Sequence, residues 1–289
     1  MKTGHSFLLN LLLLALLPGA ELRAQALKPR LRQVIATPVR KENFQLYLLI
    51  GQSNMAGRGP VEAQDTVPNR HVLRLNPTGQ WEVAQDPIHF DKPMAAVGPG
   101  LTFGRLMAAP DTTVTIGLIP CAVGGSGIDA WMPGAYFADT KTHPYDDALT
   151  RARTAMQTGM LAGIIWHQGE TDSNFEKSIV YGAKLKALIK QLRIDLHTPT
   201  VPFVAGQLPD FQINKPASDG RLQVNDAAVR INQALTSLPK EVANYAYITV
   251  EGTADIGDHT HFNAASARLL GQRYAAAMRR LQRPVRRKQ

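Results

Sequence analysis

Two short polar segments near opposite ends of the chain contain the residue types that nucleophilic catalysis needs. Ser53 lies in Gly51-Gln52-Ser53-Asn54, directly after an apolar run, and Asp258 and His261 lie three residues apart in a later segment. A serine hydroxyl becomes a nucleophile when an imidazole accepts its proton, and a carboxylate holds that imidazole in the correct tautomer. Because Asp and His at this spacing can meet within one loop, the sequence predicts a triad of Ser53, His261 and Asp258.

Each of these residues also has a simpler interpretation. A serine after a strand is often only the N-cap of a helix. Asp258 could occupy an ordinary loop turn, and His261 could be a surface histidine before a helix. A third interpretation takes His259 and His261 as a metal-binding pair with Asp258, and His167 and Glu170 as the nearby further ligands. That interpretation would make the protein a metal-dependent hydrolase.

Apolar runs of strand length alternate with amphipathic stretches of helical length. Nearly continuous apolar runs are typical of parallel strands that are buried on both faces. Strands are expected over 44–51, 113–119, 161–167, 201–207 and 245–250, and helices over 101–109, 145–160, 174–196, 222–238 and 264–281. A hairpin is expected over 74–83, after the first strand. The pattern predicts one α/β domain, a three-layer α/β/α sandwich with a parallel sheet of about five strands.

The polar segments follow the ends of these strands. Ligands in a parallel sheet bind beyond the carboxyl ends of the strands. Residues 52–54, 121–127 and 168–170 each follow an expected strand, and the loop with Asp258 and His261 follows the last one. The sequence therefore predicts that these segments form a single site.

Four motifs occur in the order found in the SGNH hydrolase superfamily, whose fold is flavodoxin-like. They most resemble its sialate O-acetylesterase and acetylxylan esterase branch, and the resemblance spans roughly residues 45 to 276. The first motif is Gly-Gln-Ser-Asn where the wider superfamily has Gly-Asp-Ser-Leu, a departure that matches the branch. The motifs are Gly51–Met55, the Gly124-Gly125-Ser126 stretch running to Trp131, Trp166–Glu170 and Asp258-x-x-His261.

The resemblance implies a role for each matching residue. Ser53 would be the nucleophile and would also give its backbone N–H to the oxyanion hole. A glycine of the Gly124-Gly125 pair, with Gly125 preferred, would supply a second N–H, and the side-chain amide of Gln168 would complete the hole. Glu170 would support this loop and could contact the catalytic histidine. Gln168 could instead be a plain buried hydrogen-bonding residue.

The resemblance also implies the reaction and the substrate. The protein would be a serine esterase that removes O-acetyl groups from a carbohydrate, an acetylated glycan or sialic acid, through an acetyl-serine intermediate. No cofactor or metal is implied. Trp131 and Trp166 could each be core residues or platforms for a sugar ring. The alternative from another class is a non-catalytic glycan-binding protein on a hydrolase scaffold.

The N-terminus predicts export. Lys2 precedes an apolar stretch over 7–17, and Ala24-Gln25-Ala26 provides the small-x-small pattern of a cleavage site. This stretch is shorter than the roughly 20 residues that span a bilayer, so 1–26 is predicted to be a signal peptide, the alternative being a retained anchor. An esterase domain over 27–282 would then be periplasmic or secreted, without stable membrane insertion. Cys121 is the only cysteine, which excludes an internal disulfide and fits a bacterial periplasm.

The net charge of +9 is concentrated at one end of the chain. Arg279 to Lys288 contain six basic residues and no acidic one, which leaves the body of the chain nearly neutral. A nearly neutral body argues against a nucleic-acid-binding surface. The basic tail over 283–289 is expected to be a solvated, fraying helix end, or alternatively a weak contact to an anionic envelope.

Overall fold

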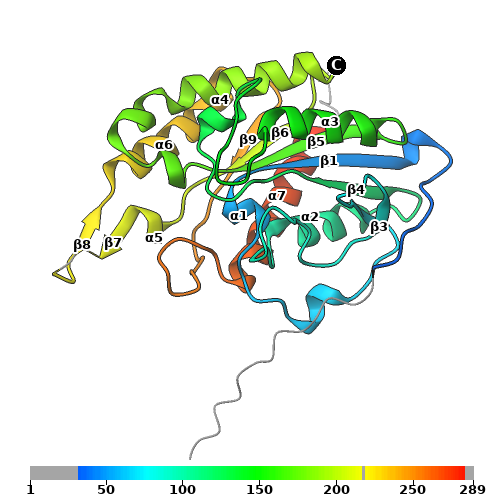
Figure 1. The fold of residues 1–289 in the computed structure, drawn as a ribbon, viewed down its shortest axis with the longest axis horizontal. Coiled ribbons are helices and arrows are strands. Elements are labelled where there is room, and N and C mark those ends of the chain that lie inside the picture. Colours follow the sequence, from blue (N-terminus) through cyan, green and yellow to red (C-terminus); the bar gives the residue numbers. More distant parts are fainter. Residues whose placement is uncertain (1–31, 217–218, 284–289) are drawn as a thin grey trace, which may run out of the picture.

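Strand β1 (Phe44–Gly51) lies at the centre of a seven-stranded sheet in the computed structural model, which describes residues 32–216 and 219–283 (Figure 1). The sheet order is β3-β2-β4-β1-β5-β6-β9. All of these strands except β3 are parallel, and five of the six parallel strands correspond to those expected from the apolar runs. The other six strands of the sheet are β2 (Val72–Leu75), β3 (Trp81–Val83), β4 (Thr115–Pro120), β5 (Met160–His167), β6 (Phe203–Gly206) and β9 (Tyr245–Ile248).

The sheet is larger than the sequence predicted because the hairpin joins it. Strands β2 and β3 form the expected antiparallel pair, and β2 also pairs in parallel with β4, with Leu73 opposite Gly117. Every residue of β2 is buried, so this strand belongs to the core and not to a surface insertion. The expectation of about five strands was therefore too low by this hairpin.

Helices cover both faces of the sheet, which confirms the three-layer sandwich (Figure 1). One layer contains α3 (Pro144–Met156), α4 (Phe175–Asp195) and α6 (Asp226–Ser237), and the other contains α2 (Pro99–Ala108) and α7 (Ala264–Gln282). Each layer packs its apolar side chains against its own face of the sheet, giving two separate hydrophobic clusters. Short helices α1 (Ser53–Ala56) and α5 (Asp210–Ile213) lie in the connections, as do 3-10 turns at Lys41–Asn43, Ala63–Thr66, Ile128–Trp131, Glu170–Asp172 and Leu238–Lys240.

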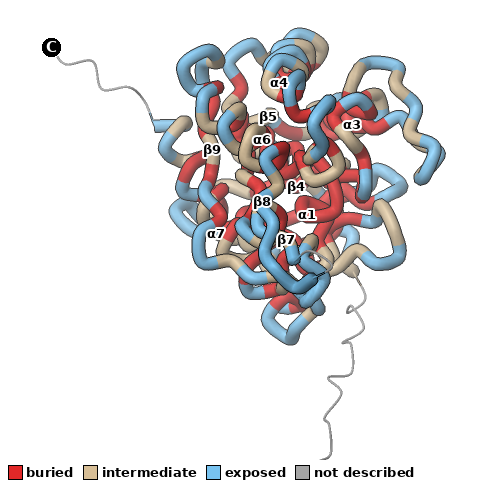
Figure 2. The backbone as a smooth tube through the Cα atoms, turned by 90° about the vertical axis from the view of Figure 1, so that its left-hand side faces the viewer, coloured by how far each residue is buried: buried red, intermediate tan, exposed pale blue. Residues whose placement is uncertain are grey.

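One expected helix begins later than predicted. Residues 222–224 were expected to open a helix, but they form β8 (Leu222–Val224), which pairs with β7 (Asn214–Pro216) in a second, two-stranded sheet. Asn225 ends this strand and caps α6, because its side chain accepts hydrogen bonds from the N–H groups of Ala227 and Ala228. In Figure 2 the β7–β8 hairpin stands exposed in front of the buried helix α1.

The proposed ends of the chain fall mostly outside the described residues. Residues 1–26, the expected signal peptide, lie outside the described residues, and so does the basic tail after Arg283. Within 32–216 and 219–283, no helix has both the length and the apolar character needed to cross a bilayer.

A glycine at the end of β1 fixes where the chain turns toward Ser53. Gly51 has a φ of +126°, and a Cβ atom there would lie 2.1 Å from the carbonyl oxygen of His167 on β5. The next residue, Gln52, donates its backbone N–H to that same oxygen at 2.9 Å. Only glycine allows the two strands to approach this closely. The position of the first motif relative to the β5 motif therefore depends on Gly51.

Replacing Gly51 by alanine is expected to lower the melting temperature strongly or to prevent folding, because the added methyl group meets backbone atoms. The matched control is Gly79→Ala. Gly79 also has a positive φ, +81°, but its Cβ would meet no atom within 4 Å, so that variant should lose only about 1 kcal/mol. Similar thermal unfolding curves for the two variants would contradict the assigned role of Gly51.

Candidate active site

The three residues of the expected triad lie in hydrogen-bonding distance of one another. The Nε2 atom of His261 is 3.0 Å from Oγ of Ser53, and its Nδ1 atom is 2.6 Å from Oδ2 of Asp258. The carboxylate accepts from Nδ1–H, which leaves Nε2 as the atom able to accept the serine proton. Ser53 begins α1 and is only 5 % exposed, so its hydroxyl lies in a sheltered site.

The loop that holds Asp258 orients its carboxylate through short-range hydrogen bonds. Oδ1 of Asp258 accepts from the backbone N–H groups of Thr260 and His261, at 2.9 and 2.8 Å. Burial by itself raises the pKa of Asp258, but the hydrogen bonds from the backbone and ring of His261 and from Thr260 outweigh it and lower that pKa. Asp258 therefore stays ionised at neutral pH and can stabilise a positive charge on the imidazole.

Asn54, which follows the candidate nucleophile, connects it to the histidine loop. Its Nδ2 group donates to the carbonyl of Thr260 at 2.9 Å, and its Oδ1 atom accepts from the N–H of Phe262 at 3.1 Å. These two backbone groups flank His261 on either side. Asn54 is 3 % exposed, so its bonds compete little with water. The side chain next to Ser53 thus fixes the position of the residue that must deprotonate Ser53.

Glu170 supports Asn54 and not the histidine. Its Oε1 atom accepts from Nδ2 of Asn54 at 2.5 Å, and its other carboxyl oxygen is buried without a hydrogen-bond partner among the described residues. No contact between Glu170 and His261 is present in this part of the chain, so the expected direct contact is absent. Burial raises the pKa of Glu170 to about 7, which means that its neutral form is populated near neutral pH.

Two backbone N–H groups near Ser53 are available to a ligand. Among the described residues, neither the N–H of Ser53 nor that of Gly125 has an acceptor, whereas the N–H of Gly124 donates to Oδ2 of Asp91 at 2.8 Å. Gly125 has a φ of +86°, a conformation that favours glycine. The structure thus favours Gly125 over Gly124 as the donor of the oxyanion loop, residues 121–127 after β4.

A buried ion pair that no sequence pattern indicated holds the oxyanion loop. The carboxylate of Asp91, which binds Gly124, also binds the guanidinium of Arg58 at 3.1 Å, and both side chains are at most 5 % exposed. A Cβ at Gly124 would lie 2.4 Å from that guanidinium. Arg58 and Asp91 are far apart in the sequence, and only the tertiary structure brings them together beside Gly124.

Gln168 is not placed as the expected oxyanion donor. It is fully buried, and its Nε2 group lies within hydrogen-bonding distance of three acceptors: Oε1 of Gln52 at 3.1 Å, the carbonyl of Ser126 at 3.3 Å and Oδ2 of Asp172 at 2.5 Å. An amide has two N–H donors, so these acceptors occupy both. The residue instead ties the β5 end to the first motif and to the oxyanion loop, as the plain buried interpretation expected.

Gln52 is the side chain that this arrangement orients, and sequence reasoning missed it. Its Oε1 atom accepts from Gln168 and from the backbone N–H of Thr171 at 3.3 Å. Its own Nε2 group has no acceptor among the described residues, next to Ser53. The signal in the sequence was an amide directly before the nucleophile, where the wider superfamily has an aspartate. Gln52 is therefore a neutral side chain directly before the candidate nucleophile whose N–H groups have no acceptor among the described residues, whereas the amide of Asn54 is already engaged.

The other histidines and the tryptophans that the alternative interpretations relied on make contacts of a different kind. His167 is fully buried against the hydroxyl of Tyr274, and burial lowers its pKa to about 3. His259 lies 3.7 Å from Asp255, separately from His261. No three or more His, Cys, Asp and Glu side chains in the described part of the chain gather as a metal site. Trp131 and Trp166 are both fully buried and pack edge to face, so they are core residues and not sugar platforms.

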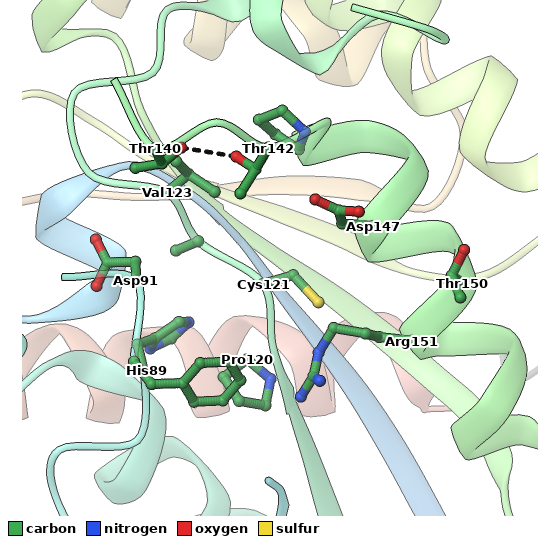
Figure 3. A pocket seen from close by; sticks show the side chains of 13 residues that line it. His89, Asp91, Pro120, Cys121, Val123, Thr140, Thr142, Asp147, Thr150 and Arg151 are labelled. Carbon is green, nitrogen blue, oxygen red and sulfur yellow. Dashed lines mark hydrogen bonds between the residues drawn. The ribbon is translucent and has the colours of Figure 1, made fainter. Parts of the chain in front are cut away.

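A cavity of about 320 Å³ lies at the end of β4 beside the oxyanion loop (Figure 3). Asp91 and Val123 line it, and the sulfur of Cys121 points toward it. Burial raises the pKa of the Cys121 thiol to about 11, so the thiol is protonated at neutral pH and is a poor nucleophile. None of the triad residues lines this cavity. The candidate catalytic centre is therefore distinct from it.

Comparison with known proteins agrees with this fold and assigns the chain to a family. Residues 43–280 match the family model described as carbohydrate esterase, sialic acid-specific acetylesterase. A probable carbohydrate esterase of Arabidopsis thaliana is 33 % identical over 181 residues, covering 55 % of this chain and 67 % of that protein.

Solved structures show the same fold. A protein of Arabidopsis thaliana has a TM-score of 0.69 at 28 % identity, over 83 % of this chain and 98 % of that one. The structure of NanS has a TM-score of 0.63 at 18 % identity, over 85 % and 98 % of the two chains. A carbohydrate acetylesterase from Xanthomonas citri has a TM-score of 0.60 at 21 % identity, over 83 % of this chain and 56 % of that one. The last two likenesses concern the fold alone.

The raised pKa of Glu170 predicts how stability depends on pH. Between its ordinary value of 4.5 and about 7, the unfolded state has lost the Glu170 proton while the folded state keeps it, so the free energy of unfolding falls as pH rises. Glu170→Gln removes this contribution and keeps an acceptor for Asn54. Urea unfolding at pH 5 and pH 8 should therefore show the variant gaining stability relative to wild type as pH rises. Glu176→Gln, an exposed site on α4, is the control; an equal gain there would contradict the assignment.

Proposed function

The chain belongs to the sialic acid-specific acetylesterase family of carbohydrate esterases and is a carboxylic ester hydrolase, and on this premise we propose that it removes O-acetyl groups from a sugar with Ser53 as nucleophile. The observation that carries the proposal is the hydrogen-bonded series from Asp258 through His261 to Ser53. It provides an activated hydroxyl, a base and an orienting carboxylate, the three parts that nucleophilic ester cleavage requires.

In the first half of the reaction, Nε2 of His261 accepts the proton of Ser53 as Oγ attacks the carbonyl carbon of the acetyl ester. The carbonyl oxygen becomes negative in the tetrahedral intermediate. When the bond to the sugar oxygen breaks, the imidazolium gives its proton to that oxygen, and the sugar leaves as an alcohol. Asp258 stabilises the transient imidazolium, and the acetyl group remains on Ser53.

In the second half, a water molecule takes the place of the sugar. His261 accepts a proton from this water, whose oxygen attacks the acetyl-serine, and a second tetrahedral intermediate forms. Its collapse returns the proton to Oγ of Ser53 and releases acetate. No redox step or additional reactant is needed, because water supplies the only atoms that are consumed.

The oxyanion of both intermediates would be bound by three donors. The backbone N–H groups of Ser53 and Gly125 are without acceptors in the described structure, and the amide of Gln52 is added as the third donor. Gln168 and Thr171 hold the carbonyl end of that amide, so its N–H end is oriented before substrate binds. Preorganised donors of this kind lower the barrier because they need no rearrangement as charge develops.

The substrate and the location remain parts of the proposal. The family description and the carbohydrate esterases among the relatives support an acetylated carbohydrate, either an acetylated glycan or sialic acid. Export to a periplasm or secretion is proposed from residues 1–26, whose basic start, apolar stretch and small-x-small pattern are those of a signal peptide.

Ser53→Ala is expected to lower kcat by roughly 10⁴-fold or more, because it removes the hydroxyl that lies 3.0 Å from Nε2 of His261. Acetate release from 4-nitrophenyl acetate and from acetylated sugars measures this, with near-UV circular dichroism to confirm folding. The control is Ser237→Ala, at the exposed end of α6. A folded Ser53→Ala protein with more than a few per cent of wild-type kcat sinks the assignment. Loss of wild-type activity in EDTA, restored by zinc, would favour a metal-dependent hydrolase instead.

The two glutamines should behave differently when changed. Gln52→Ala removes a donor used mainly in the transition state, so kcat should fall about a hundredfold with KM little altered. Gln52→Glu keeps the acceptor for Gln168 but places an anion near the oxyanion, so its kcat should be lower still. Gln168→Ala should lower both kcat and melting temperature, because buried Asp172 loses a partner.

Steady-state kinetics and melting temperatures on the same preparations separate these roles. Gln233→Ala, an exposed amide on α6, is the matched control and should leave kcat and stability unchanged. A folded Gln52→Glu enzyme with near-normal kcat would remove Gln52 from the oxyanion hole. If kcat falls for Gln168→Ala but not for Gln52→Ala, the role in the oxyanion hole returns to Gln168.

A further inference from the structure

The β7–β8 hairpin is attached directly to the candidate catalytic centre. Helix α5, which leads into it, places Phe211 edge to face against Phe262, with ring centroids 5.3 Å apart, and Phe262 follows His261 in the chain. At the other end, Asn225 donates its side-chain N–H to the carbonyl of Ser173, just after the Glu170 turn, at 3.3 Å. The hairpin is therefore anchored on both sides of the site and extends outward from it (Figure 2).

A groove of about 470 Å³ lies between this hairpin and the starts of α4 and α6. Its lining combines side chains that can hydrogen-bond with one exposed aromatic ring. We call it the hairpin groove, and its principal lining residues are Asn174, Phe175, Lys215, Gln223, Asp226 and Arg230. Lys215 and Gln223 are directly opposite each other on β7 and β8, so the pair projects on one face of the hairpin.

The groove exposes apolar surface that the fold does not need. Phe175 is 69 % exposed at the first position of α4, and Val224 on β8, which also lines the groove, is 53 % exposed. A two-stranded hairpin has little stability of its own, and clustered exposed apolar side chains commonly mark a binding surface. Arg230 lies over the ring of Phe175 at 5.6 Å and is itself held by Ser178, so it supports one side of the ring.

The groove also contains a charged side chain, Lys215, that has no ion-pair partner among the described residues. Within residues 32–216 and 219–283, no carboxylate lies within ion-pair distance of Lys215. Its ammonium nevertheless lies near enough to Glu170 to act on that carboxyl electrostatically. Since Glu170 binds Asn54, next to Ser53, this lysine connects the groove to the reaction centre.

We propose that the hairpin groove binds the sugar residues next to the acetylated one, so that the preferred substrate is an acetylated oligosaccharide or polysaccharide. This rests on the proposed esterase function. Sugar rings present hydroxyl groups, which suit the amides of Asn174 and Gln223 and the ammonium of Lys215, and apolar C–H faces, which suit the ring of Phe175. The groove lies beside the Glu170 turn, since Ser173 and Asn174 line it, and it would add binding energy from parts of the substrate that do not react.

The test compares chain lengths of substrate. Singly acetylated methyl glycosides and acetylated oligosaccharides of four to six residues, from xylose and from galacturonic acid ladders, are assayed beside 4-nitrophenyl acetate. On at least one ladder, wild-type kcat/KM should be about tenfold or more higher for the oligosaccharide than for the single sugar. The variant Phe175→Ala/Gln223→Ala should lose most of this preference, while its kcat/KM for 4-nitrophenyl acetate and for single sugars stays unchanged.

The matched control is Ile194→Ala/Gln233→Ala, which changes an exposed apolar residue at the far end of α4 and an exposed amide on α6. It should keep the wild-type preference. Equal kcat/KM for single sugars and oligosaccharides on both ladders, or full preference in the groove variant, overturns the proposal. Hydrolysis of single acetylated sugars without any length preference leaves the esterase function intact, whereas no hydrolysis of any ester overturns that function itself.

Discussion

The amide of Asn54 connects two segments of the active site that are 208 positions apart in the chain. It bonds to backbone groups on both sides of His261, so the imidazole that must reach Ser53 is held by the residue next to Ser53. Because the two bonds use the donor and the acceptor of one planar group, the loop can neither shift nor rotate without losing one of them. The 3.0 Å contact between Nε2 and Oγ depends on this constraint.

Other buried polar groups hold the rest of the site in place through hydrogen bonds in the same way. Gln168 brings together Gln52, the oxyanion loop and Asp172, and the ion pair of Arg58 with Asp91 occupies the N–H of Gly124. Each of these groups is nearly sealed from water, where an unmet hydrogen bond costs more than at the surface. The network therefore has few alternative arrangements. Its outcome is that the N–H groups of Ser53 and Gly125 remain available for a ligand.

The order of the strands in the sheet explains where this hydrogen-bond network forms. Strand β1 lies between β4 and β5, so the carboxyl ends that carry Ser53, Gly125 and Gln168 adjoin one another. A fold alone does not choose among substrates. The structural feature proposed to bear on substrate is the β7–β8 hairpin, because it forms one side of a groove of about 470 Å³ beside the Glu170 turn.

The sequence by itself determined the parallel sheet and indicated the proposed triad, because apolar strand runs and a three-residue Asp-His spacing are local patterns. The preference for Gly125 over Gly124 as a donor needed the tertiary structure, because Asp91 occupies the N–H of Gly124. The sequence pattern predicted too few strands because whether the 74–83 hairpin joins the sheet depends on pairing between β2 and β4. It left two roles open for Gln168, because the direction of a side-chain amide is set by acceptors from Gln52, Ser126 and Asp172. The roles of Asn54, Asp91 and the hairpin were decided only by the tertiary structure, since hydrogen bonds between distant segments leave no periodic signal in a single chain.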